Sequence, residues 1–157
     1  MQVLVAPGGV IIEQPSDPRV VQVVAAGVPG PPGRGVEPVA AVALEAVAQG
    51  MPMAIDRATG KLVNATAAYK PKAFVVGLAS AAVAPGFVGA AEVASLTLAD
   101  WTGVTGAAAL QPGGIYFLGA TGGLSLTPPP APACVAIVGE AISPTTLRLT
   151  VHPPIQP

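Results

Sequence analysis

The side chains that could perform catalysis are few and scattered in this chain. His152 is the single histidine and precedes Pro153-Pro154, so we expect an exposed residue of the C-terminal tail. The eight acidic residues form no close pair of the kind that glycosidases use. Cys134 is the single cysteine and lies in an apolar run, so we expect a small core residue and no intrachain disulfide. Without a cluster of cysteine and histidine ligands, we predict no metal, no cofactor and no enzyme.

Charge and hydropathy argue against nucleic acid or a membrane as a partner. The formal net charge is −1, which gives no attraction to a polyanion. The most apolar uncharged window, 73–91, is dominated by alanine and contains the turn signal Pro85-Gly86. The N-terminus lacks the basic region of a secretory signal and soon reaches Pro7-Gly8-Gly9. We therefore expect neither nucleic-acid binding, membrane insertion nor secretion by a signal peptide.

Three aromatic residues are candidates for contact with a ligand or a partner subunit: Trp101, Tyr69 and Tyr116. For Trp101, a role as an anchor in the core or in a subunit interface is favoured over a platform for a glycan ring. A glycan is kept as an alternative partner of these three side chains.

One local pattern predicts an oligomeric state. Residues 27–35 read GVP-GPP-GRG, which is three Gly-X-Y triplets with proline in the third place twice. Three polyproline-II strands can wind together only if every third residue is glycine, because no side chain fits at their shared axis. We therefore predict a homotrimer, with a Gly/Pro linker as the alternative. The residues expected to form the trimer contact are the three leading glycines and the two prolines: Gly27, Gly30, Gly33, Pro29 and Pro32.

The composition also favours an assembled protein. The chain is 52% hydrophobic and only 10% charged, whereas soluble domains carry about 25% charged residues. Its mean hydropathy is +0.65. We expect much of its surface to be buried against copies of itself or against a larger assembly.

The chain divides by composition into an N-terminal anchoring arm (1–26), the collagen-like triplets (27–35) and a folded body (36–157). The arm ends in Val20-Val21-Gln22-Val23-Val24, a β-branched run that predicts a strand. Because no hairpin partner follows this strand, we expect it to pair with a sister chain or with the edge of a foreign sheet. The anchoring residues predicted from it are Val20, Val21, Val23 and Val24.

The body is expected to be all-β, a small barrel or sandwich. Short apolar runs alternate with Gly, Pro and Thr, and one Ala-rich segment, 39–48, predicts a short helix. The runs that predict strands are 53–55, 61–63, 74–76, 93–98, 115–118, 124–126, 135–138 and 147–151.

The body also contains an apparent internal duplication of residues 49–79 as residues 111–141. A shift of 62 positions aligns short identical elements of the two copies. The aligned pairs are Gln49 with Gln111, Thr59-Gly60 with Thr121-Gly122, Leu62 with Leu124, Val76-Gly77 with Val138-Gly139, and Ala79 with Ala141. We expect two related β-units, with residues 83–108 as the link between them.

The arm and the triplets together resemble the N-terminal anchor of fibre proteins in tailed bacteriophages, on residues 20–24 and 27–33. The body is similar to a small β-domain of phage virion proteins. The elements that carry this similarity are 54–56 with 59–61, 75–79, 98–101, 111–113 with 115–118, 124–128, and 138–141 with 144–147. The collagen-like part is shorter than is usual in that family, which favours a squat trimer.

The resemblance implies a non-enzymatic structural protein at the virion surface. The expected function is a homotrimeric head fibre or capsid decoration, with phage capsid proteins as the partners of the arm. The alternatives are a short tail fibre, or an adhesion module that binds a host-surface glycan through Trp101, Tyr69 or Tyr116.

Overall fold

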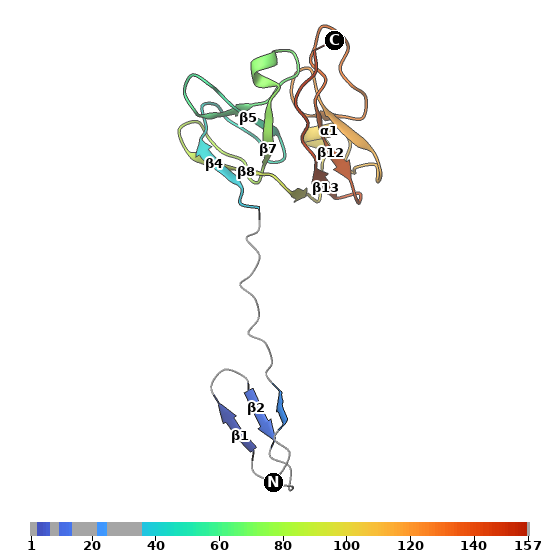
Figure 1. Cartoon of the computed structure of the whole chain (residues 1–157). Coiled ribbons are helices and arrows are strands. Elements are labelled where there is room, and N and C mark those ends of the chain that lie inside the picture. The colour runs from blue at the N-terminus through green and yellow to red at the C-terminus, as the bar shows by residue number, and fades with distance from the viewer. Residues whose placement is uncertain (1–2, 7–9, 14–21, 25–35, 157) are drawn as a thin grey trace. The chain divides into compact units, whose positions relative to one another are not determined.

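The computed structural model describes residues 3–6, 10–13, 22–24 and 36–156. The chain separates into two compact units, Met1–Gly35 and Val36–Pro157, both of which are built from strands (Figure 1). Each unit is described by itself below.

The N-terminal unit contains an antiparallel sheet of three strands in the order β1-β2-β3. These strands are β1 (Val3–Ala6), β2 (Val10–Glu13) and β3 (Gln22–Val24). The prediction that the 20–24 strand has no partner in its own chain is wrong, because β3 pairs with β2, with Val23 opposite Ile12. A long segment separates the two strands, so no hairpin signal marks their pairing. Of the predicted anchoring residues, Val23 and Val24 lie in β3, whereas Val20 and Val21 lie outside the described residues, as do the triplets.

The body is all-β and consists of two antiparallel five-stranded sheets (Figure 1). The first sheet contains β4 (Val39–Val42), β5 (Pro52–Ile55), β6 (Leu62–Asn64), β7 (Val75–Ala79) and β8 (Val88–Glu92). The second contains β9 (Ser95–Thr97), β10 (Ile115–Leu118), β11 (Leu124–Ser125), β12 (Ile137–Ala141) and β13 (Thr146–Leu149). The helical segments among the described residues are one 3-10 turn, η1 (Lys70–Lys72), and one short helix, α1 (Thr102–Thr105).

The two sheets repeat the same strand order. The first runs β6-β5-β7-β8-β4 and the second β11-β10-β12-β13-β9, so each strand of the first sheet has a counterpart five strands later. Both sheets carry a bulge at the same place, where the register shifts after Met53 in β5 and after Tyr116 in β10. Met53 lies opposite Gly77, and Tyr116 lies opposite Gly139. The origin of this structural repeat in a duplication stays a prediction.

The structural register corrects one of the aligned sequence pairs. The amide of Gly50 donates to the carbonyl of Ala79, and the amide of Gly113 donates to that of Ala141. Gly50 and Gly113 are therefore counterparts, which excludes Gln49 and Gln111 as a pair. The turn closed between Asp56 and Lys61 is one residue longer than the turn closed between Gly119 and Gly123. The shift is therefore 63 positions before this turn and 62 after it.

Two other expectations for the body are wrong. Residues 39–42 of the predicted 39–48 helix form β4, because hydrogen bonding to β8 outweighs the weak helix propensity of this alanine-rich segment. Residues 83–108 are not a simple link, since they contain β8, β9 and α1. The composition of β8 is Val-Gly-Ala-Ala-Glu, which carries little strand propensity of its own.

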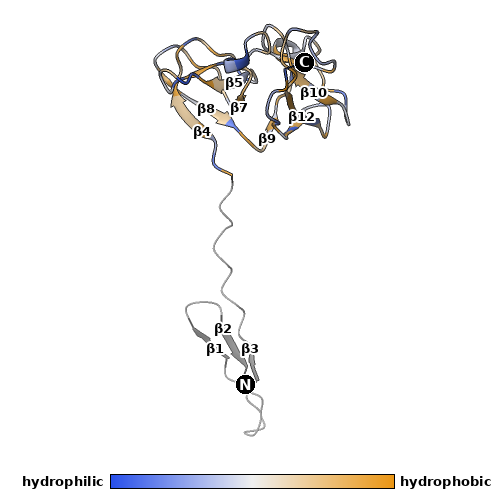
Figure 2. Ribbon diagram, turned by 45° about the horizontal axis from the view of Figure 1, so that its top comes forward, coloured by the Kyte–Doolittle hydropathy of each residue, from blue (hydrophilic) through white to orange (hydrophobic). Residues whose placement is uncertain are grey.

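The body has two hydrophobic clusters, and the larger one includes residues from both sheets. The larger cluster joins Ala54, Val63 and Leu78 of the first sheet to side chains of the second, such as Leu118 and Leu147. The smaller cluster lies on the opposite face of the first sheet and contains Met53, Leu62, Ala79, Ala91 and Val47. The apolar strands that supply both clusters are visible in Figure 2. Burial of the side chains in the larger cluster is the main force that holds the two sheets together.

A glycine occupies the same position in the central strand of each sheet. A Cβ on Gly77 of β7 would collide with the carbonyl oxygen of Glu92, and a Cβ on Gly139 of β12 with that of Arg148. The colliding atoms belong to the backbone of the neighbouring strand, which cannot move without breaking its ladder. Each sheet therefore depends on a missing side chain at its centre.

We predict that Gly139→Ala lowers the free energy of unfolding by about 1–3 kcal/mol, because the added methyl overpacks the β12–β13 contact. The matched control is Gly103→Ala in α1, where an added Cβ has no neighbour within 4 Å. The control should leave stability unchanged or slightly raised, since alanine favours a helix more than glycine does. Denaturant unfolding measures both variants, and equal stabilities would contradict the steric role of Gly139.

Candidate functional site

Trp101 is part of the protein core. Its side chain is 0% exposed within the larger hydrophobic cluster. The indole N–H donates a hydrogen bond of 2.9 Å to the carbonyl oxygen of Thr145, which satisfies the one polar atom of the ring. The favoured prediction that Trp101 is an anchor in the core is therefore confirmed, and the alternative of a stacking platform for a glycan is wrong, because no face of the ring is free.

Tyr116 and Tyr69 lie in opposite environments. Tyr116 is only 3% exposed, and its hydroxyl accepts a hydrogen bond of 2.9 Å from the backbone N–H of Gln111. Tyr69 is 60% exposed and directly precedes η1. The structure therefore does not gather the three predicted aromatic residues on one surface, and Tyr69 alone of them is available to a partner.

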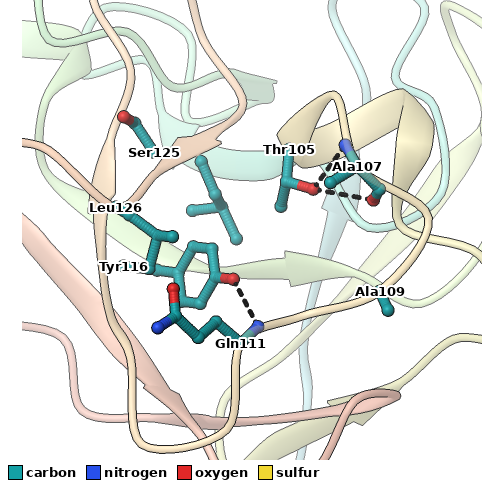
Figure 3. A pocket seen from close by; sticks show the side chains of 8 residues that line it. Thr105, Ala107, Ala109, Gln111, Tyr116, Ser125 and Leu126 are labelled. Atoms are coloured by element: carbon teal, nitrogen blue, oxygen red, sulfur yellow. Dashed lines mark hydrogen bonds between the residues drawn. The ribbon is translucent and has the colours of Figure 1, made fainter.

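A small pocket of about 290 Å³ opens beside Tyr116, between the loop after α1 and strands β10 and β11 (Figure 3). Its lining contains no charged side chain: Thr105, Ala107, Ala109, Gln111, Tyr116, Leu124, Ser125 and Leu126. The hydroxyl of Thr105 already forms hydrogen bonds with backbone groups of Trp101 and Ala107. The pocket can thus offer hydrogen bonds and apolar contact, but its lining holds no acid or base for catalysis. This pocket could not be predicted from the sequence, because residues 105–111 lie beside β10 and β11 only in the folded chain.

The charged side chains of the body mostly form local contacts. The guanidinium of Arg148 lies 2.7 Å from the Glu140 carboxylate, and the ammonium of Lys72 lies 3.8 Å from that of Glu45. Arg57 lies over the ring of Phe74, 4.9 Å from its centroid. Among the described residues, no three Asp, Glu, His or Cys side chains gather in a way that could hold a metal ion. His152 is exposed and Cys134 is buried.

Two aspartates order their loops through neighbouring threonines. The Asp100 carboxylate accepts hydrogen bonds from the Thr102 hydroxyl at 2.6 Å and from the Thr102 backbone N–H at 2.8 Å, just before α1. Asp56 accepts the same two bonds from Thr59 in the turn after β5. Because both bonds favour the charged carboxylate, they lower the pKa of Asp100 and of Asp56 below the usual 3.8, with the hydroxyl bond as the largest cause.

We predict that Thr102→Val raises the pKa of Asp100 toward 3.8, because valine removes the hydroxyl donor and keeps the backbone donor. A pKa depressed by folding adds stability that is present above the unfolded pKa and is lost as the pH falls through the folded one. The acid sensitivity that Asp100 contributes should therefore shrink in this variant. NMR titration of the carboxyl carbon measures the pKa directly.

Thr105→Val is the matched control for that titration, because the hydroxyl of Thr105 bonds to backbone carbonyls and makes no contact with Asp100. An unchanged pKa of Asp100 in Thr102→Val would contradict the assigned cause.

One surface feature was missed by sequence reasoning: a group of exposed apolar side chains on and beside strands β4 and β8. Val88 is 69% exposed, Phe87 68% and Leu44 46%. The sequence of β4, Val-Ala-Ala-Val, shows no apolar-polar alternation that would have revealed this surface, and the alanine content of 39–48 favoured a helix instead. This surface belongs to the first sheet, whereas the pocket is lined by strands of the second sheet and the loop after α1.

No protein-family model and no curated protein matches this chain. Within the parts of the chain that the structure describes, no helix combines the length and hydrophobicity needed to cross a membrane.

Proposed function

We propose that this chain is a non-enzymatic structural protein of a tailed bacteriophage, a homotrimeric head fibre or capsid decoration at the virion surface. The observation that carries the proposal is the position of the Gly-X-Y triplets. They end at Gly35, where the boundary between the two compact units falls. A trimer contact at 27–35 would therefore join three chains at the end of the first compact unit, directly before the second.

The proposed anchor is the sheet of the N-terminal unit. In the order β1-β2-β3, both β1 and β3 are edge strands, and an edge strand offers backbone groups to which a strand of another protein can add. Val23 and Val24 belong to the β3 edge. Because β3 is already held by β2, the arm would present a preformed sheet edge to the capsid in place of a lone strand.

The alternative to a head fibre is a short tail fibre or an adhesion module. The ligand proposed for this alternative is a glycan of the host surface. The pocket beside Tyr116 favours this second function, because its uncharged lining of hydroxyl, amide and apolar groups suits a sugar. The exposed ring of Tyr69 supplies an aromatic surface elsewhere on the body.

The first test of the proposal is the oligomeric state. Native mass spectrometry should give three times the chain mass of 15.3 kDa. Gly30→Ala should weaken the trimer, because a methyl group does not fit at the axis of a collagen-like helix. The control is Val28→Ala in the X position of the first triplet, which faces away from that axis and should leave the trimer intact. A wild-type chain that is monomeric at micromolar concentration would overturn the trimer.

The second test concerns the anchor. Deletion of residues 1–26 should abolish incorporation into the phage particle, because the sheet that adds to the capsid is lost. Circular dichroism should show that the body of the truncated chain is still folded. Truncated protein that decorates particles as well as the full chain does would rule out the arm as the anchor.

A further inference from the structure

The first sheet has one face that is only partly covered. On that face, Ala54, Val63 and Leu78 of strands β5, β6 and β7 are buried in the cluster shared with the second sheet. The register places Leu78 opposite Glu92 at the end of β8, so the same face continues across β8 and then β4. The second sheet therefore covers β5, β6 and β7, whereas β8 and β4 lie beyond the cluster.

The uncovered part of this face is apolar. Side chains alternate along a strand, and β4 pairs with β8 so that Ala40 faces Ala90 and Val42 faces Val88. Leu44 follows β4 and is also exposed. We call these residues the β4–β8 face: Ala40, Val42, Leu44, Val88 and Ala90. None of them belongs to either hydrophobic cluster.

The structural repeat shows what this position looks like when it faces water. The counterparts of Ala40 and Ala90 are Thr97 on β9 and Thr146 on β13, whose hydroxyls share a hydrogen bond of 2.9 Å. The counterpart of Glu92 is Arg148, which pairs with Glu140. The second sheet thus has polar side chains where the first has alanine. This difference indicates that the two faces meet different surroundings, since large exposed apolar patches mark interaction surfaces.

We infer that the β4–β8 face packs against a second copy of the same chain around the threefold axis of the trimer; this inference rests on the proposed function. The argument for a second copy is the length of chain between the triplets and β4. β4 begins at Val39, four residues after Gly35, and four extended residues span at most about 14 Å. Three chains wound together at 27–35 must therefore bring three β4 strands close to one axis.

The charge on this surface also favours a copy of the same chain as the occupant. The β4–β8 face carries no charged side chain, and Glu92 lies only at its border. An identical neutral surface can approach this face without electrostatic repulsion. A charged partner would find no opposite charge on this face to pair with.

The first experiment places a charge on this face in the full-length chain. Val88→Lys should raise the dissociation constant of the trimer at least about tenfold, because an unpaired ammonium would be buried between subunits. The matched control is Ile115→Lys on β10, a strand residue that is 50% exposed, outside the β4–β8 face. Analytical ultracentrifugation over a range of concentrations measures both variants.

A second variant tests proximity without disturbing the fold. Cys134 is only 2% exposed, so a cysteine introduced on the surface is the reactive thiol of the native chain. Ala40→Cys should give cross-linked dimers with a short bismaleimide, because each chain then offers one reactive thiol, whereas its structural counterpart Thr97→Cys should not. If Val88→Lys fails to fold, as judged by circular dichroism, this cross-linking decides the question.

The outcomes separate the two proposals. A wild-type trimer that dissociates in Val88→Lys and cross-links through Ala40→Cys supports the interface. A wild-type trimer that does neither is held by the arm or the triplets alone, which overturns the inference and leaves the proposed function standing. A monomeric wild-type chain overturns both.

Discussion

The architecture of the body depends on close backbone contact at the centre of each sheet. Gly77 in β7 and Gly139 in β12 leave the space into which the carbonyl oxygen of the neighbouring strand fits. Gly77 lies opposite Met53 and Gly139 lies opposite Tyr116, and in both sheets the register shifts directly beside this glycine. A side chain at either glycine would force β8 or β13 away and break the ladder that carries the outer strands.

The two sheets share this frame but carry different surfaces. Leu78 of the first sheet is buried against the second, whereas its counterpart Glu140 forms an ion pair with Arg148 at the surface. The contact between the sheets is therefore asymmetric. One consequence is that the first sheet is apolar on both faces and leaves the β4–β8 face uncovered. The outward face of the second sheet carries the Glu140–Arg148 ion pair and the bonded threonines Thr97 and Thr146, together with the half-exposed Ile115.

This asymmetry supports the proposal of a trimeric surface fibre, because it leaves one apolar face of the body uncovered. In the proposed trimer, another copy of the chain would cover the β4–β8 face, because the triplets come shortly before β4 in the sequence. The outward face of the second sheet, with its Glu140–Arg148 ion pair, would then face solvent. In the same proposal, the edges of the sheet in the N-terminal unit would make a separate contact with the particle.

The all-β class could be predicted from local sequence alone, because apolar and β-branched runs such as Ile115–Leu118 alternate with turns. The turn glycines Gly60 and Gly122 could also be predicted, since both adopt the positive φ angles that favour glycine. The strands β4 and β8 could not, because Ala-rich segments acquire strand structure only by pairing with each other. Tertiary structure alone decided the burial of Trp101, the partner of β3 and the uncovered β4–β8 face. These features depend on contacts between residues distant in the chain, and local propensity carries no information about which distant segments meet.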